Sequence, residues 1–322
     1  MAWNPFLTSE DGATGLQSLS RGRAALVLAA VTLAMFADVL FWPGERILSQ
    51  AGTDISHQFL YWRQFAVDQM RSGNLPLWNP HLFSGAPFFG GFQSALLYPP
   101  HLLFLILPLG KAINAVIALH IFLLGFFLYL WISSRGLHPA ACLSAAVIGM
   151  FCGPVFLHIY AGHLPNLCTM AWAPLVFFAL DGMVERQWAP SCLIGSLAVS
   201  MQIYAGHPQY VYYTGVAAAA YLALRLVRSD SRLKTLAGFA VSYAAGAALG
   251  TVQILSGMDA AAESVRSLGV SYGFASSFSL PPENLITLVA PSFFGDMTNL
   301  PYWGRCYLWE MSLFFGVTGL TL

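Results

Sequence analysis

The sequence Ile-Tyr-Ala-Gly-His occurs twice, at residues 159–163 and 203–207. In both copies a glycine that can end a helix is followed by a histidine. A histidine in this position can hydrogen-bond a phosphate or hydroxyl group, or ligate a metal ion. The alternative is that the imidazole only complements the C-terminal end of the helix dipole. Because the arrangement is repeated, we favour function and treat His163 and His207 as candidate substrate-binding residues.

Asp54 stands directly before a segment with helical periodicity. Apolar residues recur at helical spacing from Ile55 to Met70, and Gly73 then ends the pattern. A carboxylate at a helix start is often a cap, because free amides and the helix dipole favour it. The alternative is a catalytic base that accepts a proton from a hydroxyl group. From spacing alone the cap is the favoured interpretation.

Three further acids, Glu283, Asp296 and Glu310, lie in or beside a second polar segment. Glu283 follows two prolines and is suited to a helix start. Glu310 comes just before an apolar run, where an acid is costly unless it has a partner or faces a cavity. Glu310 is therefore the best functional candidate of the three. Asp38, near the end of the first apolar run, could pair with an arginine or support Asp54.

The composition indicates which elements must position these residues. The 322 residues are 57% hydrophobic and only 9% charged, with a mean hydropathy of +0.65. A soluble domain carries about 25% charged residues. The sequence therefore predicts an all-α polytopic membrane protein. No basic cluster suggests a nucleic-acid partner, and the five cysteines, which lack metal-like spacing, are interpreted as packing residues.

Apolar runs of membrane-spanning length follow one another along most of the chain. Spans are predicted at residues 24–43, 112–132, 139–159, 165–183, 189–206, 209–227 and 235–256. A further span is predicted to begin near Glu310 and to continue to the end of the sequence.

Positive charge predicts how these spans are oriented. Arginines precede the first span, and most of the later positive charge lies in the connection at 225–234. The positive-inside rule places both on the cytoplasmic side, with residues 1–23 as a cytoplasmic N-terminal segment. Both histidine turns then face outward. So do two long segments, a first outer loop at 44–110 and a second outer loop at 257–309.

The first outer loop also resembles a known family. Gly52, Asp54, Gln58 and the run "SGNLPLWNPHLFSGAPFFGGFQSALLYPPHLLFLILPL" are similar to the bacterial YfhO-type membrane protein family, which belongs to the GT-C glycosyltransferases. The segments "LPPENLITLVAPSFFG", "YWG" and "WEMSLFFGVTGLTL" resemble its second outer loop and following helix. The likeness covers most of residues 24–322. Family members continue with more spans and an outer soluble region, so we expect this chain to correspond to the N-terminal module, truncated at its C-terminus.

The resemblance implies a GT-C-like transmembrane helix bundle whose long first extracytoplasmic loop contains an interfacial helix. It also implies a polyprenyl-phosphate-sugar donor and a general base in the first outer loop, a position that Asp54 matches. The expected reaction is direct displacement with inversion, in which Asp54 takes the proton of an acceptor hydroxyl. The expected acceptor is a glycan, lipid or protein of the cell envelope. The expected location, among membrane lipid, is the inner membrane of a bacterium.

The departing phosphate needs cationic or hydrogen-bonding partners, and the outer side offers several. The candidate substrate-binding residues are Asp38, His57, Arg63, Gln93, His163, His207, Arg305 and Glu310, with Arg266 as a further cation. The sequence shows no compact ligand spacing, so we expect no metal site and no cofactor. The alternative is a divalent metal held by the histidines with Asp54 or Glu310.

Two other functions fit parts of the pattern. A transporter or flippase of a lipid-linked substrate would carry broken helices and polar residues near the middle of the bilayer. Here the titratable groups gather on one face instead. A truncated, non-catalytic scaffold would keep the fold without the chemistry. Replacing Asp54 by asparagine separates these functions, because only a catalyst should lose turnover.

Overall fold

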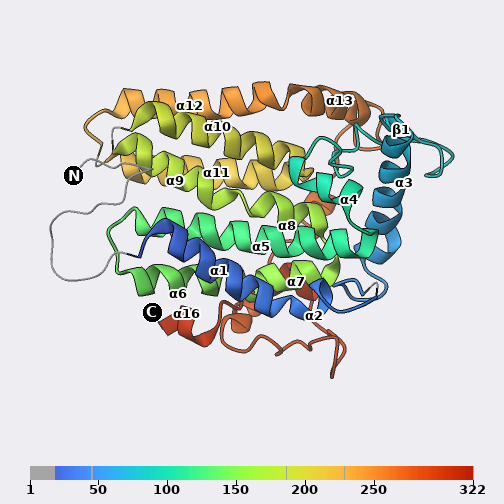
Figure 1. Cartoon of the computed structure of the whole chain (residues 1–322), viewed down its shortest axis with the longest axis horizontal. Helices are drawn as coiled ribbons and strands as arrows, with labels where there is room; N and C mark the ends of the chain where they lie inside the picture. The colour runs from blue at the N-terminus through green and yellow to red at the C-terminus, as the bar shows by residue number, and fades with distance from the viewer. Residues whose placement is uncertain (1–18, 45, 186, 228, 322) are drawn as a thin grey trace.

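The computed structural model describes residues 19–44, 46–185, 187–227 and 229–321, and it is mostly helical (Figure 1). The long helices are α1 (Arg21–Met35), α5 (Leu109–Ser133), α6 (Pro139–Met150), α9 (Ala173–Val184), α10 (Trp188–Ala205), α11 (Pro208–Leu226), α12 (Arg232–Leu249) and α13 (Thr251–Ala262). Shorter helices lie between and after these: α2 (Ala37–Leu40), α7 (Gly153–Ala161), α8 (Leu164–Met170), α14 (Tyr272–Ala275), η3 (Pro282–Leu288), α15 (Leu308–Met311) and α16 (Val317–Thr321). The all-α prediction is confirmed. Most of the expected N-terminal segment lies outside the described residues.

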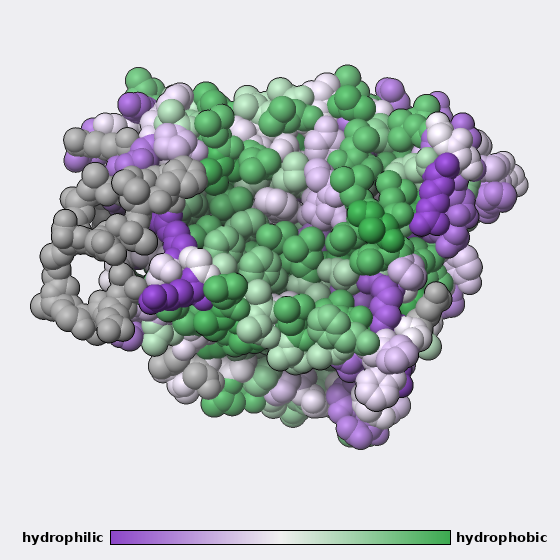
Figure 2. All heavy atoms as spheres, in the orientation of Figure 1, coloured by the Kyte–Doolittle hydropathy of each residue, from purple (hydrophilic) through white to green (hydrophobic). Residues whose placement is uncertain are grey.

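Within the described ranges, three helical segments are long and apolar enough to cross a bilayer: Leu109–Ser133, Pro139–Ala161 and Leu164–Val184. A fourth is added if α12 and α13, which bend by 73° at Gly250, count as one span. Figure 2 shows an apolar surface over the middle of the helices, with hydrophilic residues toward both ends. These features indicate association with a membrane.

Small residues set the closest helix contacts in the bundle. A Cβ atom on Gly195 of α10 would lie 2.6 Å from Ser242 Oγ of α12. A Cβ atom on Gly246 of α12 would lie 2.7 Å from the Cβ atom of Val199 on α10. Glycine and serine at such contacts let two backbones approach closely, as membrane helix pairs do.

The segment between α2 and α5 crosses one end of the bundle, which we call the loop end (Figure 1). It contains η1 (Ile55–Phe59), α3 (Leu60–Arg71), the antiparallel strands β1 (Trp78–Asn79) and β2 (Ala86–Pro87), η2 (Pro99–Leu102) and α4 (Leu103–Ile106). η1 is a π-helical turn that leads directly into α3. Ile55, Phe59 and Ala66, from the predicted apolar face, are buried.

The opposite end carries a compact ionic network around Asp181, here called the Asp181 network. The Asp181 carboxylate lies 2.8 Å from Arg135 Nη2 and 2.9 Å from Arg225 Nε. Its two oxygens also accept hydrogen bonds from Trp131 Nε1 at 3.0 Å and from the Tyr221 hydroxyl at 2.6 Å. Four partners thus compensate a carboxylate that is almost fully buried.

The predicted span from Glu310 onward was wrong, because α15 and α16 are separated by residues that form no helix. The backbone between them bonds to other elements instead. Leu313 N donates to Thr287 Oγ1 at 3.0 Å, and Phe314 O accepts from Gly153 N at 2.8 Å. These bonds satisfy polar groups that a helix would have paired internally.

Candidate functional site

Asp54 does not cap the helix that follows it. Its backbone is already in the right-handed helical region, and its carboxylate makes no capping hydrogen bond. The side chain is 54% exposed, which leaves both carboxylate oxygens accessible. The residue stands at the start of the π-helical turn η1, and π-helical turns occur frequently at functional sites. The structure therefore argues against the cap and leaves a half-exposed carboxylate at this position.

The first repeated turn fits directly against Asp54. Gly162 ends α7 with φ +77°, and a Cβ atom there would lie 2.6 Å from Ile55 N and 3.2 Å from Asp54 N. Only glycine allows both this conformation and this approach. The next residue, His163, places Nε2 3.7 Å from Asp54 Oδ2. The turn thus sets both the position of the Asp54 backbone and the partner of its carboxylate.

The same turn brings two histidines together. His163 N donates to His158 O at 2.9 Å, the hydrogen bond that closes a Schellman motif. This motif brings the two bonded residues' side chains near each other, and His158 Nδ1 lies 3.0 Å from His163 Nδ1. His158 was missed by the sequence reasoning. The signal was present as two histidines five residues apart across a helix-ending glycine.

Glu310 joins this histidine pair from a distant part of the chain. A carboxylate oxygen of Glu310 and one ring nitrogen each of His158 and His163 lie within 4.8 Å of one another. The neighbouring Trp309 ring stands edge-on to His163, with centroids 6.2 Å apart. α15 therefore packs against the first turn and delivers the acid. We call Asp54, His158, His163 and Glu310 the loop-end cluster.

The second repeated turn lies beside the first, and Tyr210 connects the two. The Tyr210 hydroxyl lies 2.8 Å from His158 Nε2, and its ring centroid is 4.9 Å from that of His207. His207 is half-buried and its Nδ1 atom has no hydrogen-bond partner within the described residues. Burial, with His163 nearby, lowers the pKa of His207 to about 4, so this imidazole is neutral at physiological pH.

The second turn also rests on the loop between α2 and α5. A Cβ atom on Gly206, at φ +95°, would lie 2.6 Å from Phe92 O and 3.2 Å from Gln93 Cα. The Gln93 side chain accepts a hydrogen bond from Gln58 Nε2 at 3.1 Å. The repeated sequence is thus explained: each glycine turn holds one part of the same loop. Gln93 lies in this contact, next to the second turn.

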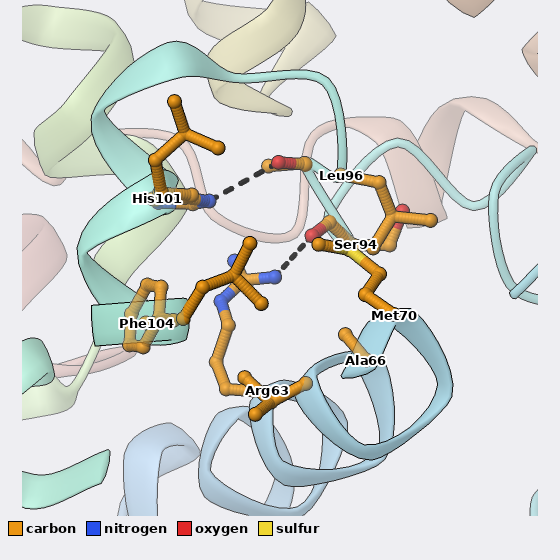
Figure 3. Close-up of a pocket in the computed structure, with 11 residues that line it drawn as sticks. Arg63, Ala66, Met70, Ser94, Leu96, His101 and Phe104 are labelled. Carbon is orange, nitrogen blue, oxygen red and sulfur yellow. Dashed lines mark hydrogen bonds between the residues drawn. The ribbon is translucent and has the colours of Figure 1, made fainter. Parts of the chain in front are cut away.

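Arg63 holds the loop from below, as Figure 3 shows. Its guanidinium is buried, donates to the carbonyl oxygens of Gln93 and Ser94, and stands over the Phe104 ring. Burial lowers the pKa of Arg63 to about 10, so it remains a cation at neutral pH. The adjoining pocket has a cavity volume of only about 20 Å³, room for one water molecule. The placement does not support Arg63 as a phosphate ligand.

The remaining sequence candidates are Asp38, His57, Arg305 and Arg266. Asp38 and His57 are exposed. Arg305 forms an ion pair with Glu283 at 2.6 Å, and Arg266 stacks over an aromatic ring, both in the segment after α13. No hydrogen bond or ion pair among the described residues connects these four side chains to Asp54. The structure brings together Asp54, both repeated turns and Glu310, and leaves the expected phosphate-binding arginines elsewhere.

Comparison of the chain with protein-family models, with curated proteins and with solved structures found no match. The family resemblance therefore rests on the quoted segments alone, and the function is argued below from the site.

Proposed function

We propose that this chain is a membrane-embedded glycosyltransferase in which Asp54 is the general base. The observation that carries the proposal is the uncapped, half-exposed Asp54 carboxylate, held beside His163 at the end of an apolar helix bundle. A carboxylate in this state can accept a proton from a bound hydroxyl group. Its position where apolar helices meet a polar surface suits a lipid-linked sugar donor.

The proposed reaction is a single displacement with inversion. Asp54 takes the proton of the acceptor hydroxyl, whose oxygen forms a bond to the anomeric carbon of the sugar. The bond from that carbon to the lipid phosphate breaks, and its electron pair stays on the phosphate. Phosphate is a good leaving group and needs little acid catalysis, whereas the acceptor hydroxyl is a poor nucleophile and needs a base. A positioned base supplies about 10²–10⁴ in rate.

The two turns supply groups for the departing phosphate in this proposal. His163 contacts His158, which bonds Tyr210, and His207 packs against the Tyr210 ring, so both turns offer imidazole nitrogens for hydrogen bonding. They replace the arginines that the sequence suggested. With the loop end on the extracytoplasmic side of a bacterial inner membrane, the donor is a polyprenyl-phosphate-sugar and the acceptor belongs to the cell envelope.

The test is transfer of labelled sugar from synthetic polyprenyl-phosphate donors in membranes that contain the full chain. Asp54→Asn should abolish transfer and leave the protein folded. Asp68→Asn is the matched control, because this exposed acid lies on the same loop but bonds only Gln64 and Ser72 among the described residues. Equal transfer by wild type and Asp54→Asn would remove Asp54 from the mechanism.

One observation favours a transporter or flippase as the second candidate. α12 and α13 form a helix broken by 73° at Gly250, and broken helices are common in transporters. The acidic side chains of the loop-end cluster and of the Asp181 network, however, lie at the two ends of the bundle. Movement of a fluorescent lipid-linked substrate across vesicles, unaffected by Asp54→Asn, would favour the transporter.

A further inference from the structure

The loop-end cluster has the composition and spacing of a metal site. We propose that His158, His163 and Glu310 bind one divalent transition-metal ion of the zinc class. Two imidazoles and a carboxylate are a ligand set that zinc accepts, whereas Mg²⁺ prefers oxygen ligands alone. The proposal concerns metal binding itself and does not depend on the transferase reaction.

The distances fit a common metal between the three side chains. The Nδ1 atoms of His158 and His163 are 3.0 Å apart, and both rings join Glu310 in a group of ligand atoms within 4.8 Å. Two nitrogens bound tetrahedrally to zinc at about 2.0–2.1 Å lie roughly 3.3 Å apart. A small rotation of the rings therefore converts the observed pair into a chelate.

The outward nitrogen of His158 has the hydrogen-bond partner that a metal-bound histidine requires, and that of His163 has a carboxylate nearby. His158 Nε2 lies 2.8 Å from the Tyr210 hydroxyl, and His163 Nε2 lies 3.7 Å from Asp54 Oδ2. When Nδ1 binds a metal, Nε2 carries the hydrogen and donates it to such a partner. Both rings thus direct Nδ1 toward each other and Nε2 toward an oxygen.

The burial of the three side chains leaves the site open on one side. His158 is buried, the His163 side chain is 15% exposed, and Glu310 is exposed. Three protein ligands leave a tetrahedral ion one position for water or an oxyanion. The alternative is that the two Nδ1 atoms only share a proton in a hydrogen bond between histidines. Metal binding distinguishes these states directly.

The experiment uses the full chain in detergent, stripped with EDTA and titrated with ZnCl₂ at pH 7.5. We expect one tightly bound zinc ion per chain, measured by calorimetry and by elemental analysis after desalting. His163→Gln and Glu310→Gln should each weaken binding at least tenfold. X-ray absorption of the zinc-loaded protein should show two imidazole ligands.

Two controls separate this site from other zinc ligands. His57→Gln removes an exposed histidine at the same end, and Cys306→Ser removes the one cysteine that is not buried. Neither should change the stoichiometry or affinity. Each site variant must match the metal-free wild type in thermal unfolding, which excludes misfolding as the cause. The proposal would be overturned if wild type bound no zinc, or if His163→Gln and Glu310→Gln bound zinc as tightly as wild type does.

Discussion

The two ends of the bundle each hold a carboxylate, but the two differ in exposure and in the number of their partners. At one end the Asp181 side chain is 5% exposed and both of its oxygens are engaged by cations or hydrogen-bond donors. At the loop end the Asp54 side chain is 54% exposed, and the imidazole Nε2 of His163 is 3.7 Å from its carboxylate. The first carboxylate is saturated with partners, and the second retains the capacity to accept a proton.

This difference distinguishes polar groups that stabilise the fold from polar groups that remain accessible to a ligand. A buried charge requires compensation, and the partners that supply it also occupy the oxygens that a substrate would need. The Asp181 network therefore ties α5, α9 and α11 together. The loop-end cluster is instead partly open to solvent, so its two carboxylates remain accessible to a ligand.

Asp54→Asn gives the largest expected effect. We expect transfer activity to fall by about 10²–10⁴, the usual contribution of a general base. The free energy of unfolding should change by less than about 0.5 kcal/mol, since the side chain makes no capping bond. Labelled-sugar transfer and thermal unfolding measure the two quantities. A large loss of stability would show that Asp54, like Asp181, has a structural role, which would contradict the difference drawn between the two ends.

Asp181→Asn should show the reverse pattern. Removing the charge leaves Arg135 without an acidic partner and Arg225 with only Glu185, at 3.6 Å. Breaking a buried pair costs about 3–5 kcal/mol, and the partial exposure of Arg135 places this case near about 3 kcal/mol. Thermal unfolding in detergent measures the loss. Transfer per folded molecule should be unchanged, and a selective loss of transfer would contradict the structural role.

Gly162→Ala tests whether the turn positions Asp54. Gly136 is the matched control, because it has φ +71° at the opposite end but open space around a Cβ atom. Both variants should lose about 1 kcal/mol from the left-handed conformation. Gly162→Ala should lose about 2 kcal/mol more, since its Cβ meets Ile55 N. Equal unfolding temperatures for the two variants would rule out this role of the turn.

Acid should loosen the loop end through His207. The pKa of His207 is lowered from 6.5 to about 4 in the folded protein. The unfolded chain binds more protons in that interval, so stability falls as the pH drops from about 6.5 to about 4. The share of His207 is on the order of 1–2 kcal/mol, allowing for solvent access.

Hydrogen exchange at pH 7 and pH 4.5 locates the effect. Protection in α10 and α11 near the second turn should fall at the lower pH. His207→Gln, which stays neutral, should reduce this fall. Uniform loss of protection across the bundle would show that the acid sensitivity does not come from the loop end.

Local signals carried much of this site. Asp54 and the two glycine-histidine turns were found because helix starts and ends have short sequence signatures. His158 was missed because its role depends on the three-dimensional closure of the turn, which brings it to His163. Glu310 was selected as a costly acid beside an apolar run, but its histidine partners are distant in sequence.

Long-range packing explains the remaining differences. Arg63 was expected to face a substrate, but its guanidinium donates hydrogen bonds to the carbonyl oxygens of a loop about thirty residues away. Hydropathy predicted a helix after Glu310, yet Thr287 and Gly153 bind the backbone of that segment instead. A single sequence gives no signal for either contact. The mostly helical class, in contrast, follows from composition and periodicity and is confirmed, and three residues of the predicted apolar face, Ile55, Phe59 and Ala66, are buried.

The π-helical turn Ile55–Phe59 fixes the angular phase of Asp54 relative to the rest of α3. A π-helical turn holds one residue more than an α-helical turn of the same rise. Each residue advances an α-helix by about 100°. Deleting one residue from this turn would regularise the helix and swing Asp54 about a quarter of a circle away from His163. The direction in which the Asp54 carboxylate points therefore depends on the number of residues in this turn, and not only on which side chains surround it.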